Sequence, residues 1–179
     1  MGQNSSIDEM AAIHAAHCID DLRLSLSASE FGYRMQAVAA HILLRLNYEV
    51  QDIRRSGHPD IIATRGVDEY RFEIEAEVVG RRARQLKRAD FESLLDVTGA
   101  AGYFALAIGS PRPRWVVVPA DRLVNRKPCR TLLLDVLSDI GFSHAWTHEY
   151  INLLNDHCRR IRRASFRSLC DRALAGSGL

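Results

Sequence analysis

The sequence lacks long apolar runs, internal repeats and low-complexity segments. No stretch approaches the ~20 apolar residues that a membrane-spanning helix needs. The start, MGQNSSIDEM, is polar and acidic, whereas a signal peptide would be basic and then apolar. We therefore expect a soluble, cytoplasmic protein that does not enter a membrane. With 179 residues, 47% of them hydrophobic, the chain can bury one core, so we expect a single domain over 1–179.

Cysteine is scarce, and no CxxC pair is present that would predict a zinc or redox motif. We expect the four widely spaced cysteines to be buried free thiols: Cys18, Cys129, Cys158 and Cys170. A metal site is the less specific alternative, because His144 and His148 share a helix face at i, i+4 and His157 precedes Cys158.

A large excess of charge is missing too, since the formal net charge is only +2. Its distribution is nevertheless uneven. Between residues 159 and 172 the chain has one carboxylate, Asp171, and six arginines: Arg159, Arg160, Arg162, Arg163, Arg167 and Arg172. Such a run can neutralise nucleic-acid phosphates, and it is equally typical of a solvated helix face, so both interpretations stay open.

Two capping boxes predict helices in the first part of the chain. Ser6 and Ser27 can each accept a hydrogen bond from a free backbone amide, while the glutamate three residues later reaches back. After the second box, apolar residues recur at helical spacing: Phe31, Met35, Val38, Ile42 and Leu46. They predict a helix that faces the core and ends near Asn47.

Three β-compatible segments follow this helix. Residues 48–53 and 61–63 predict a hairpin around the turn at 56–59. The clearest strand spans 70–78, where an apolar set alternates with a charged set: Tyr70, Phe72, Ile74, Ala76 and Val78 against Arg71, Glu73, Glu75 and Glu77. One face of that strand should pack in the core and the other should be acidic.

The rest of the chain alternates between helical and strand patterns. Residues 86–97 predict a helix ending at Gly99, and 103–108 and 115–118 predict buried strands. Residues 131–134 predict a further strand, and the segment from 143 to about 174 predicts one or two helices. The expected order is α-α-β-β-β-α-β-β-(β)-α.

The acidic face of the strand at 70–78 needs an explanation. Glu73, Glu75 and Glu77 lie roughly 6 to 7 Å apart along one face, and each neighbouring pair costs about 2 to 3 kcal/mol at an effective dielectric of 20. Solvent and nearby arginines can offset this repulsion: Arg81, Arg82 and Arg84. The alternative is a divalent cation, because Mg²⁺ prefers carboxylate oxygens and keeps open positions for water and phosphate.

The position of Asp60 favours a divalent cation, rather than solvent and arginines, as the partner of the glutamates. Asp60 follows Pro59 at the start of the preceding strand, so it can approach the glutamate row across the hairpin. Proline restricts the backbone ahead of the aspartate and helps to aim it, although Pro-Asp is also a frequent turn dipeptide.

Together these segments resemble the PD-(D/E)xK, or restriction endonuclease-like, nuclease superfamily, whose core has the order α-β-β-β-α-β. The resemblance covers about 30–123 and is carried by SEFGYRMQAVAAHILLRLNYEV, SGHPDIIATR, YRFEIEAEVV, RQLKRADFESLLDVTG, GYFALAIG and RWVVVPADRL. It implies an α/β fold, a mixed sheet flanked by helices, with a nuclease-like core at 30–124 and helical extensions at 1–29 and 125–179. The layout is most similar to the Holliday-junction resolvases and the Mrr-like restriction enzymes.

The resemblance also implies roles for individual residues. Asp60 matches the metal-binding aspartate of the PD element, and Glu75 matches the acid of the (D/E)xK element. Glu77 then stands where the family has a lysine that orients or activates water, although some restriction enzymes of the superfamily have glutamate there and remain active. The alternative frame pairs Glu73 with Glu75, and we prefer Glu75 with Glu77.

Two further residues match family positions less closely. Gln36 stands on the first core helix, where relatives often have a glutamate or glutamine facing the site. Lys87 is either a relocated active-site lysine or a surface lysine beside Arg88.

The function implied by the resemblance is a metal-dependent endonuclease that hydrolyses DNA, with Mg²⁺ or Mn²⁺ held by Asp60, Glu75 and Glu77. Arginines near the motif and in the C-terminal segment would contact DNA phosphates: Arg54, Arg55, Arg81, Arg82, Arg159, Arg163 and Arg167. A homodimer is expected by analogy, because two active sites cut two strands. The alternative, permitted by the missing lysine, is an inactive nuclease-fold protein that binds DNA or another protein.

Overall fold

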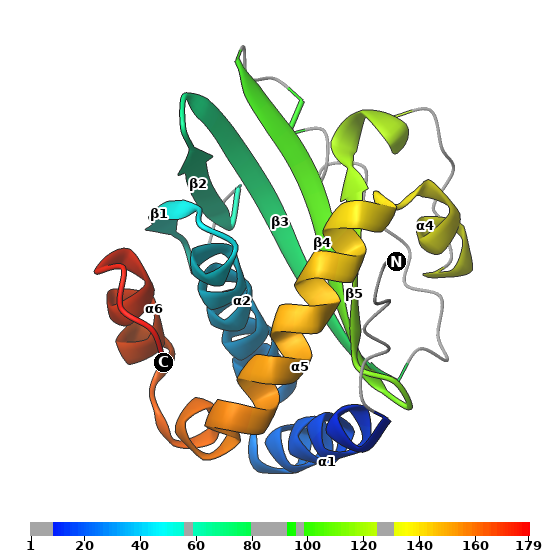
Figure 1. Cartoon of the computed structure of the whole chain (residues 1–179), viewed down its shortest axis with the longest axis vertical. Helices are drawn as coiled ribbons and strands as arrows, with labels where there is room; N and C mark the ends of the chain where they lie inside the picture. The colour runs from blue at the N-terminus through cyan, green and yellow to red at the C-terminus, as the bar shows by residue number, and fades with distance from the viewer. Residues whose placement is uncertain (1–8, 56–58, 80–92, 96–98, 125–130) are drawn as a thin grey trace, which may run out of the picture.

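The computed structural model describes residues 9–55, 59–79, 93–95, 99–124 and 131–179. Five strands form one sheet in the order β1-β2-β3-β4-β5 (Figure 1). Their bounds are β1 Glu49–Ile53, β2 Ile61–Arg65, β3 Asp68–Val79, β4 Ala100–Ser110 and β5 Arg114–Pro119. The sheet is mixed, because β3 and β4 are parallel whereas the other neighbours are antiparallel.

Helices cover the sheet. The described helices are α1 Glu9–Ser25, α2 Ala28–Arg45, the short 3₁₀ helix η1 Ala120–Arg122, α4 Thr131–Leu137, α5 Ile140–Arg163 and α6 Phe166–Leu174. Figure 1 shows α2 and α5 over the same face of the sheet, with α1 across their lower ends. None of the described helices is both long enough and apolar enough to cross a bilayer.

The predicted α/β class is confirmed, since a mixed sheet is flanked by helices. The helix from the second capping box, the hairpin and the next three strands all form at the expected places. The predicted helix at 86–97 lies outside the described residues except for 93–95, which form a turn. Ser6 of the first capping box is outside them as well.

The strand predicted at 131–134 is wrong, because these residues begin α4. Leu134 and Leu137 recur at helical spacing and pack in the second apolar cluster of the protein. On the outer side of β5, where a sixth strand would pair, the backbone is already hydrogen-bonded to α5.

The α2 helix follows its sequence closely. The Ser27 hydroxyl accepts a hydrogen bond from the Glu30 amide at 3.2 Å, as the capping box predicts. The apolar stripe is buried against β3 and α5 as far as Leu43, and the chain reverses at Asn47, which has a φ of 63°. The first turns of α2 lie beside residues 73–76 of β3, because both segments line one cavity.

His41 is a buried polar residue on α2, with only 2% of its surface exposed. Its Nε2 atom lies 3.0 Å from the Leu169 carbonyl of α6, which fixes the tautomer as Nε2–H because a carbonyl can only accept. Burial lowers the pKa of His41 to about 4, and Arg172, His157 and Arg45 lower it further against the Leu169 hydrogen bond. The imidazole is therefore neutral at neutral pH.

Neutral His41 predicts acid sensitivity. The unfolded chain takes up the proton near pH 6.5 and the native chain only near pH 4, so between these values the unfolded state binds more protons and stability falls as pH falls. We expect a loss of about 1.4 kcal/mol per pH unit, roughly 3 kcal/mol in all, in urea unfolding at pH 7, 6, 5 and 4. His41→Gln should remove much of this slope, whereas His148→Gln, exposed on α5, should not. Equal slopes in all three proteins would contradict the assignment.

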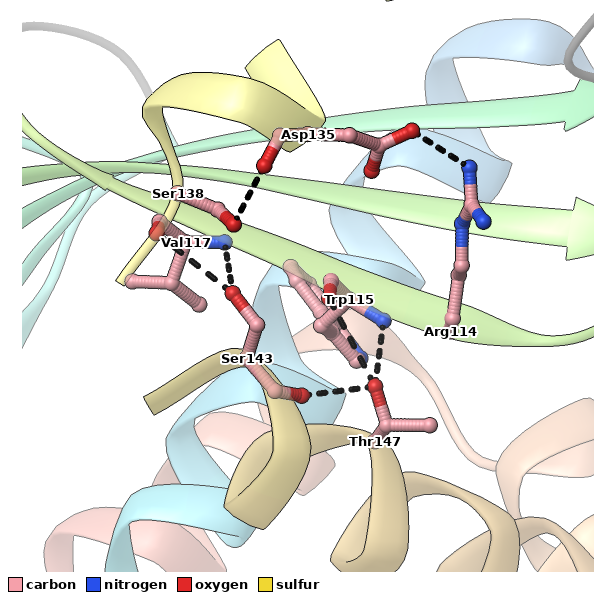
Figure 2. A network of polar contacts seen from close by, with 7 residues as sticks. All are labelled: Arg114, Trp115, Val117, Asp135, Ser138, Ser143 and Thr147. Carbon is pink, nitrogen blue, oxygen red and sulfur yellow. Dashed lines mark hydrogen bonds and ion pairs between the residues drawn. The ribbon is translucent and has the colours of Figure 1, made fainter. Parts of the chain in front are cut away.

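The outer edge of β5 is covered by hydroxyls of α5 (Figure 2). Ser143 Oγ accepts from the Val117 amide at 2.9 Å, and Thr147 Oγ1 accepts from the Trp115 amide at 3.0 Å while donating to the Ser143 carbonyl at 2.7 Å. Because the two hydroxyls are one helical turn apart, they match strand residues two apart. They satisfy amides that a bare edge would offer to another strand.

Removing these hydroxyls should therefore destabilise the protein and expose the edge. Ser143→Ala with Thr147→Val leaves two strand amides without their partners, and each unsatisfied amide costs ~1–3 kcal/mol. We expect denaturant unfolding to show a loss of roughly 2–5 kcal/mol, and light scattering to show aggregation. His144→Ala and His148→Ala, exposed on the same helix, should change stability by less than about 0.5 kcal/mol. A double variant as stable as these controls would contradict the role.

The cysteines depart from the prediction of free thiols. Cys18 of α1 and Cys158 of α5 form a disulfide that spans 140 residues of sequence. Spacing could not reveal it, because the pair meets only after α1 packs on α5. Cys170 is buried and free, as predicted, and burial raises its pKa to about 12. Cys129 lies outside the described residues.

Candidate active site at the edge of β3 beyond β2

The site begins where β2 stops. The β2–β3 ladder ends at the pair Ile61 and Phe72, so β3 continues for several residues without β2 beside it. Extending the register by one residue places Asp60 opposite Glu73. The Asp60 side chain takes over from the missing strand, because its Oδ2 accepts a hydrogen bond from the Ile74 amide at 2.9 Å.

A cavity of about 430 Å³ lies along this edge, between β3 and the first turns of α2. Asp60, Glu73 and Glu75 all line it, together with residues from both elements: Ala28, Ser29, Gly32, Tyr33, Gln36, Ile74 and Ala76. The sequence predicted that the strand after Asp60 lies beside the strand of the glutamates. This prediction is confirmed, since β2 and β3 are direct neighbours in the sheet. Glu77 does not line this cavity.

The acidic row is much less exposed than its sequence suggests. Glu73 has only 6% of its surface exposed, and Glu75 and Glu77 are half-buried. In the parallel β3–β4 register the three glutamates pair with apolar residues of the second cluster: Phe104, Leu106 and Ile108. A carboxylate beside apolar side chains is stable only where a cation, a hydrogen-bond donor or a proton compensates its charge.

Gln36 supports the aspartate through the backbone. Its Nε2 donates to the carbonyls of Arg54 and Asp60, and the Arg54 amide donates to the same Asp60 carbonyl at 2.8 Å. Gln36 itself is 4% exposed. It therefore holds together the two ends of the β1–β2 connection and fixes the position of Asp60, in addition to lining the cavity.

The rim of the cavity combines aromatic and basic side chains. Tyr33 lines the cavity, and the Arg55 guanidinium lies 4.8 Å from the centre of its ring. Arg55 also approaches Glu30 at 3.5 Å. On α6, the Phe166 ring lies 5.4 Å from Tyr33, which brings the arginine-rich α5–α6 junction to the same rim.

The other predicted residues are more scattered. Arg54 is exposed and pairs with Asp52 at 2.6 Å, away from the cavity lining. Arg159, Arg163 and Arg167 are exposed on α5 and α6. Lys87, Arg81 and Arg82 lie outside the described residues, so their predicted roles stay predictions.

A preformed multidentate metal site is not present in the described part of the chain, where no three His, Cys, Asp or Glu side chains form a suitable group. That result includes the histidines and Cys158 of the C-terminal helices, and the Cys158 sulfur is engaged in the disulfide. The carboxylates at the β3 edge still fit Mg²⁺, because Mg²⁺ in nucleases and related enzymes is held by one or two carboxylates and keeps several waters.

Two residues that line the cavity, Glu73 and Tyr33, were not among the preferred candidates from the sequence. Glu73 was set aside in favour of Glu77, because spacing on a strand cannot distinguish the two frames. The hairpin geometry was the available signal. In an antiparallel pair, the residue before the first residue of β2 faces the residue after its partner on β3, so Asp60 faces Glu73. Tyr33 had no sequence signal, because its place at the rim depends on the packing of α6.

Known proteins give no match at the level of sequence and a partial match at the level of structure. No family model and no curated protein sequence matches this chain. Among solved structures it is similar to Hjc, a Holliday junction resolvase from the archaeal hyperthermophile Archaeoglobus fulgidus. The match covers 56% of this chain and 88% of that chain, with 19% identity and a TM-score of 0.43. A similarity of this size carries no argument about activity.

Proposed function

We propose that this protein is a metal-dependent endonuclease that hydrolyses phosphodiester bonds of DNA. The observation that carries the proposal is the cavity at the edge of β3 beyond β2, where Asp60 is held by the Ile74 amide and lies with Glu73 and Glu75. Three carboxylates line this cavity, and carboxylate oxygens are the ligands that Mg²⁺ prefers in proteins. DNA supplies the phosphate, and Mg²⁺ or Mn²⁺ is the expected cofactor.

The chain offers two assignments of its acids. In one, Asp60 and Glu75 hold the cation and Glu77 holds a second ion or accepts a proton from water. In the other, Asp60 and Glu73 hold the cation and Glu75 accepts the proton. We favour the second, because Glu73 and Glu75 line the cavity with Asp60 and Glu77 does not.

The remaining residues position the reaction. Gln36 holds the backbone of Asp60, and Arg55 on the rim is placed to contact a phosphate that flanks the scissile one. A bound divalent ion would supply charge neutralisation at the phosphate and a lower pKa for the attacking water. Glu75 or Glu77, according to the assignment, accepts the proton that this water gives up.

The test is cleavage by the purified protein. Supercoiled plasmid, branched DNA, linear duplex and RNA are each incubated with Mg²⁺ or Mn²⁺ and again with EDTA. We expect nicking or cutting of DNA that EDTA stops and that Asp60→Asn removes. Asp52→Asn, which changes an exposed aspartate on β1, is the matched control and should leave cleavage intact. Cleavage of RNA alone would replace the DNA assignment.

A second candidate is an inactive nuclease-fold protein that binds DNA or another protein. It is favoured by one observation, that neither acidic frame contains a lysine at its third position. DNA binding without cleavage of any of these substrates, in either metal, would select it. A homodimer, expected by analogy, would appear in sedimentation as twice the 20.1 kDa mass of the chain.

The arginines of the α5–α6 junction should strengthen DNA binding without setting sequence preference, because phosphate contacts carry no base information. Replacing Arg163 and Arg167 by Gln should weaken binding to all DNA sequences alike. The slope of log affinity against log salt should become shallower by about one to two. Arg23→Gln, on α1, is the control. If the salt dependence of DNA binding did not change, the arginines of the α5–α6 junction would be a solvated helix face and not a phosphate contact.

A further inference from the structure

The disulfide lies under the largest of the described cavities, away from the acidic site. This cavity measures about 680 Å³ and is formed by α1 and the last turns of α5. Its lining includes Cys158 but not Cys18: His14, Asp21, Asn155, Asp156, His157, Cys158, Arg159, Arg160 and Arg162. Cys18 is 3% exposed, so a solvent molecule reaches the disulfide from the Cys158 side.

Positive charge dominates the open part of this cavity. Both lining aspartates are engaged, because Arg162 approaches Asp21 at 3.8 Å and Arg45 approaches Asp156 at 3.5 Å. Arg159 and Arg160 are exposed, and no described carboxylate pairs with either of them. Burial, and then Arg45, lower the pKa of His157, so the imidazole adds no charge at neutral pH.

The helix is also distorted at this point. His157, directly before Cys158, has non-helical angles of φ −129° and ψ 15°, which kink α5 beside the disulfide. His157 and Cys158 both line the cavity. An anionic molecule in the cavity meets Arg159, Arg160 and the half-buried Cys158.

We propose that this cavity is an exchange site at which a small carboxylate-bearing thiol attacks the Cys18–Cys158 disulfide and becomes bonded to Cys158. The incoming thiolate sulfur forms a bond to Cys158 Sγ, the disulfide breaks, and its electron pair leaves on Cys18 Sγ, which takes a proton from solvent. The incoming thiol is oxidised and Cys18 is reduced. A second equivalent of thiol then displaces Cys158 as a thiolate and leaves as a small disulfide.

Exchange would cut the covalent tie between α1 and α5 while leaving α1 docked. Ile19 of α1 packs directly over Gly109 of β4, where any side chain would collide with it. Asn155 of α5 also donates to the Ala11 carbonyl at 3.2 Å. The site is independent of the acidic cavity, so neither proposal depends on the other.

The experiment compares two probe thiols on the full chain carrying Cys129→Ser, which removes the cysteine outside the described residues. Reduced glutathione is the anionic probe and cysteamine the cationic one, at equal thiolate concentration. Peptide mapping by mass spectrometry should find the adduct on Cys158. Glutathione should react about 3- to 10-fold faster than cysteamine at low salt, and the ratio should approach one at high salt.

Arginine variants complete the test. Arg159→Gln with Arg160→Gln should bring the rate ratio close to one, whereas Arg167→Gln on α6 should preserve it. A second variant tests the site even if the double arginine variant fails to fold. Cys18→Ser should leave a free thiol at Cys158, which oxidised glutathione should modify. The proposal is overturned by an adduct on Cys18, by a ratio that neither salt nor the arginines change, or by a wild type whose cysteines react as free thiols when purified without reductant.

Discussion

Glu73→Gln should reduce the rate of metal-dependent DNA cleavage by roughly 100- to 10,000-fold. Loss of one charged ligand removes several kcal/mol of transition-state stabilisation, and each 1.36 kcal/mol is a factor of ten. The amide keeps the shape of a side chain that is 6% exposed, so the fold should survive, which circular dichroism can check. The measurement is the single-turnover cleavage rate at saturating Mg²⁺.

Glu77→Gln is the matched control for this prediction. It makes the same change four residues further along the same face of β3, at a residue outside the cavity lining. Under the favoured assignment it should cost less than about tenfold in rate. If Glu77→Gln abolished cleavage while Glu73→Gln spared it, the frame of Glu75 and Glu77 would be the correct one.

Replacing both Cys18 and Cys158 by serine should cost about 2–5 kcal/mol in the free energy of unfolding. The disulfide closes a loop of 140 residues, for which chain entropy alone gives a stabilisation of roughly 5 kcal/mol. Strain and residual structure in the unfolded chain usually reduce that value. For a chain of this size the midpoint should fall by roughly 4–20 °C in calorimetry without reductant.

Reductant supplies the internal control for the disulfide. Dithiothreitol should lower the midpoint of the wild type toward that of the double serine variant and leave the variant unchanged. Denatured without reductant, the wild type should show two reactive thiols instead of four. A midpoint that ignores reductant, together with four reactive thiols, would show that the cysteines are free.

Local patterns in the sequence predicted most of the fold. The capping box at Ser27, the apolar stripe after it and the period-two alternation at 70–78 each act through neighbours in the chain, so each produced the expected element. The prediction failed at 131–134, where four residues are too few to separate a helix from a strand. There, the covered edge of β5, the burial of Leu134 and the packing of partly buried Leu137 favour a helix.

The site was less predictable, because it depends on contacts between distant segments. The sequence identified Asp60 and the glutamate row but could not say which glutamates reach the cavity. That choice follows from where the β2–β3 ladder ends. Three features form only in the packed structure. They are the burial of Glu73 beside β4, the hydrogen bond from Gln36 to the Asp60 carbonyl and the disulfide between α1 and α5.

The central claim is that the carboxylates at the edge of β3 beyond β2 bind a divalent cation. Its most direct test is a Mn²⁺ titration followed by electron paramagnetic resonance, on the wild type, Asp60→Asn and the control Asp52→Asn. We predict saturable binding to the wild type and to Asp52→Asn, weakened at least tenfold in Asp60→Asn. A wild type that binds no Mn²⁺, or binding that Asp60→Asn leaves unchanged, would contradict the account.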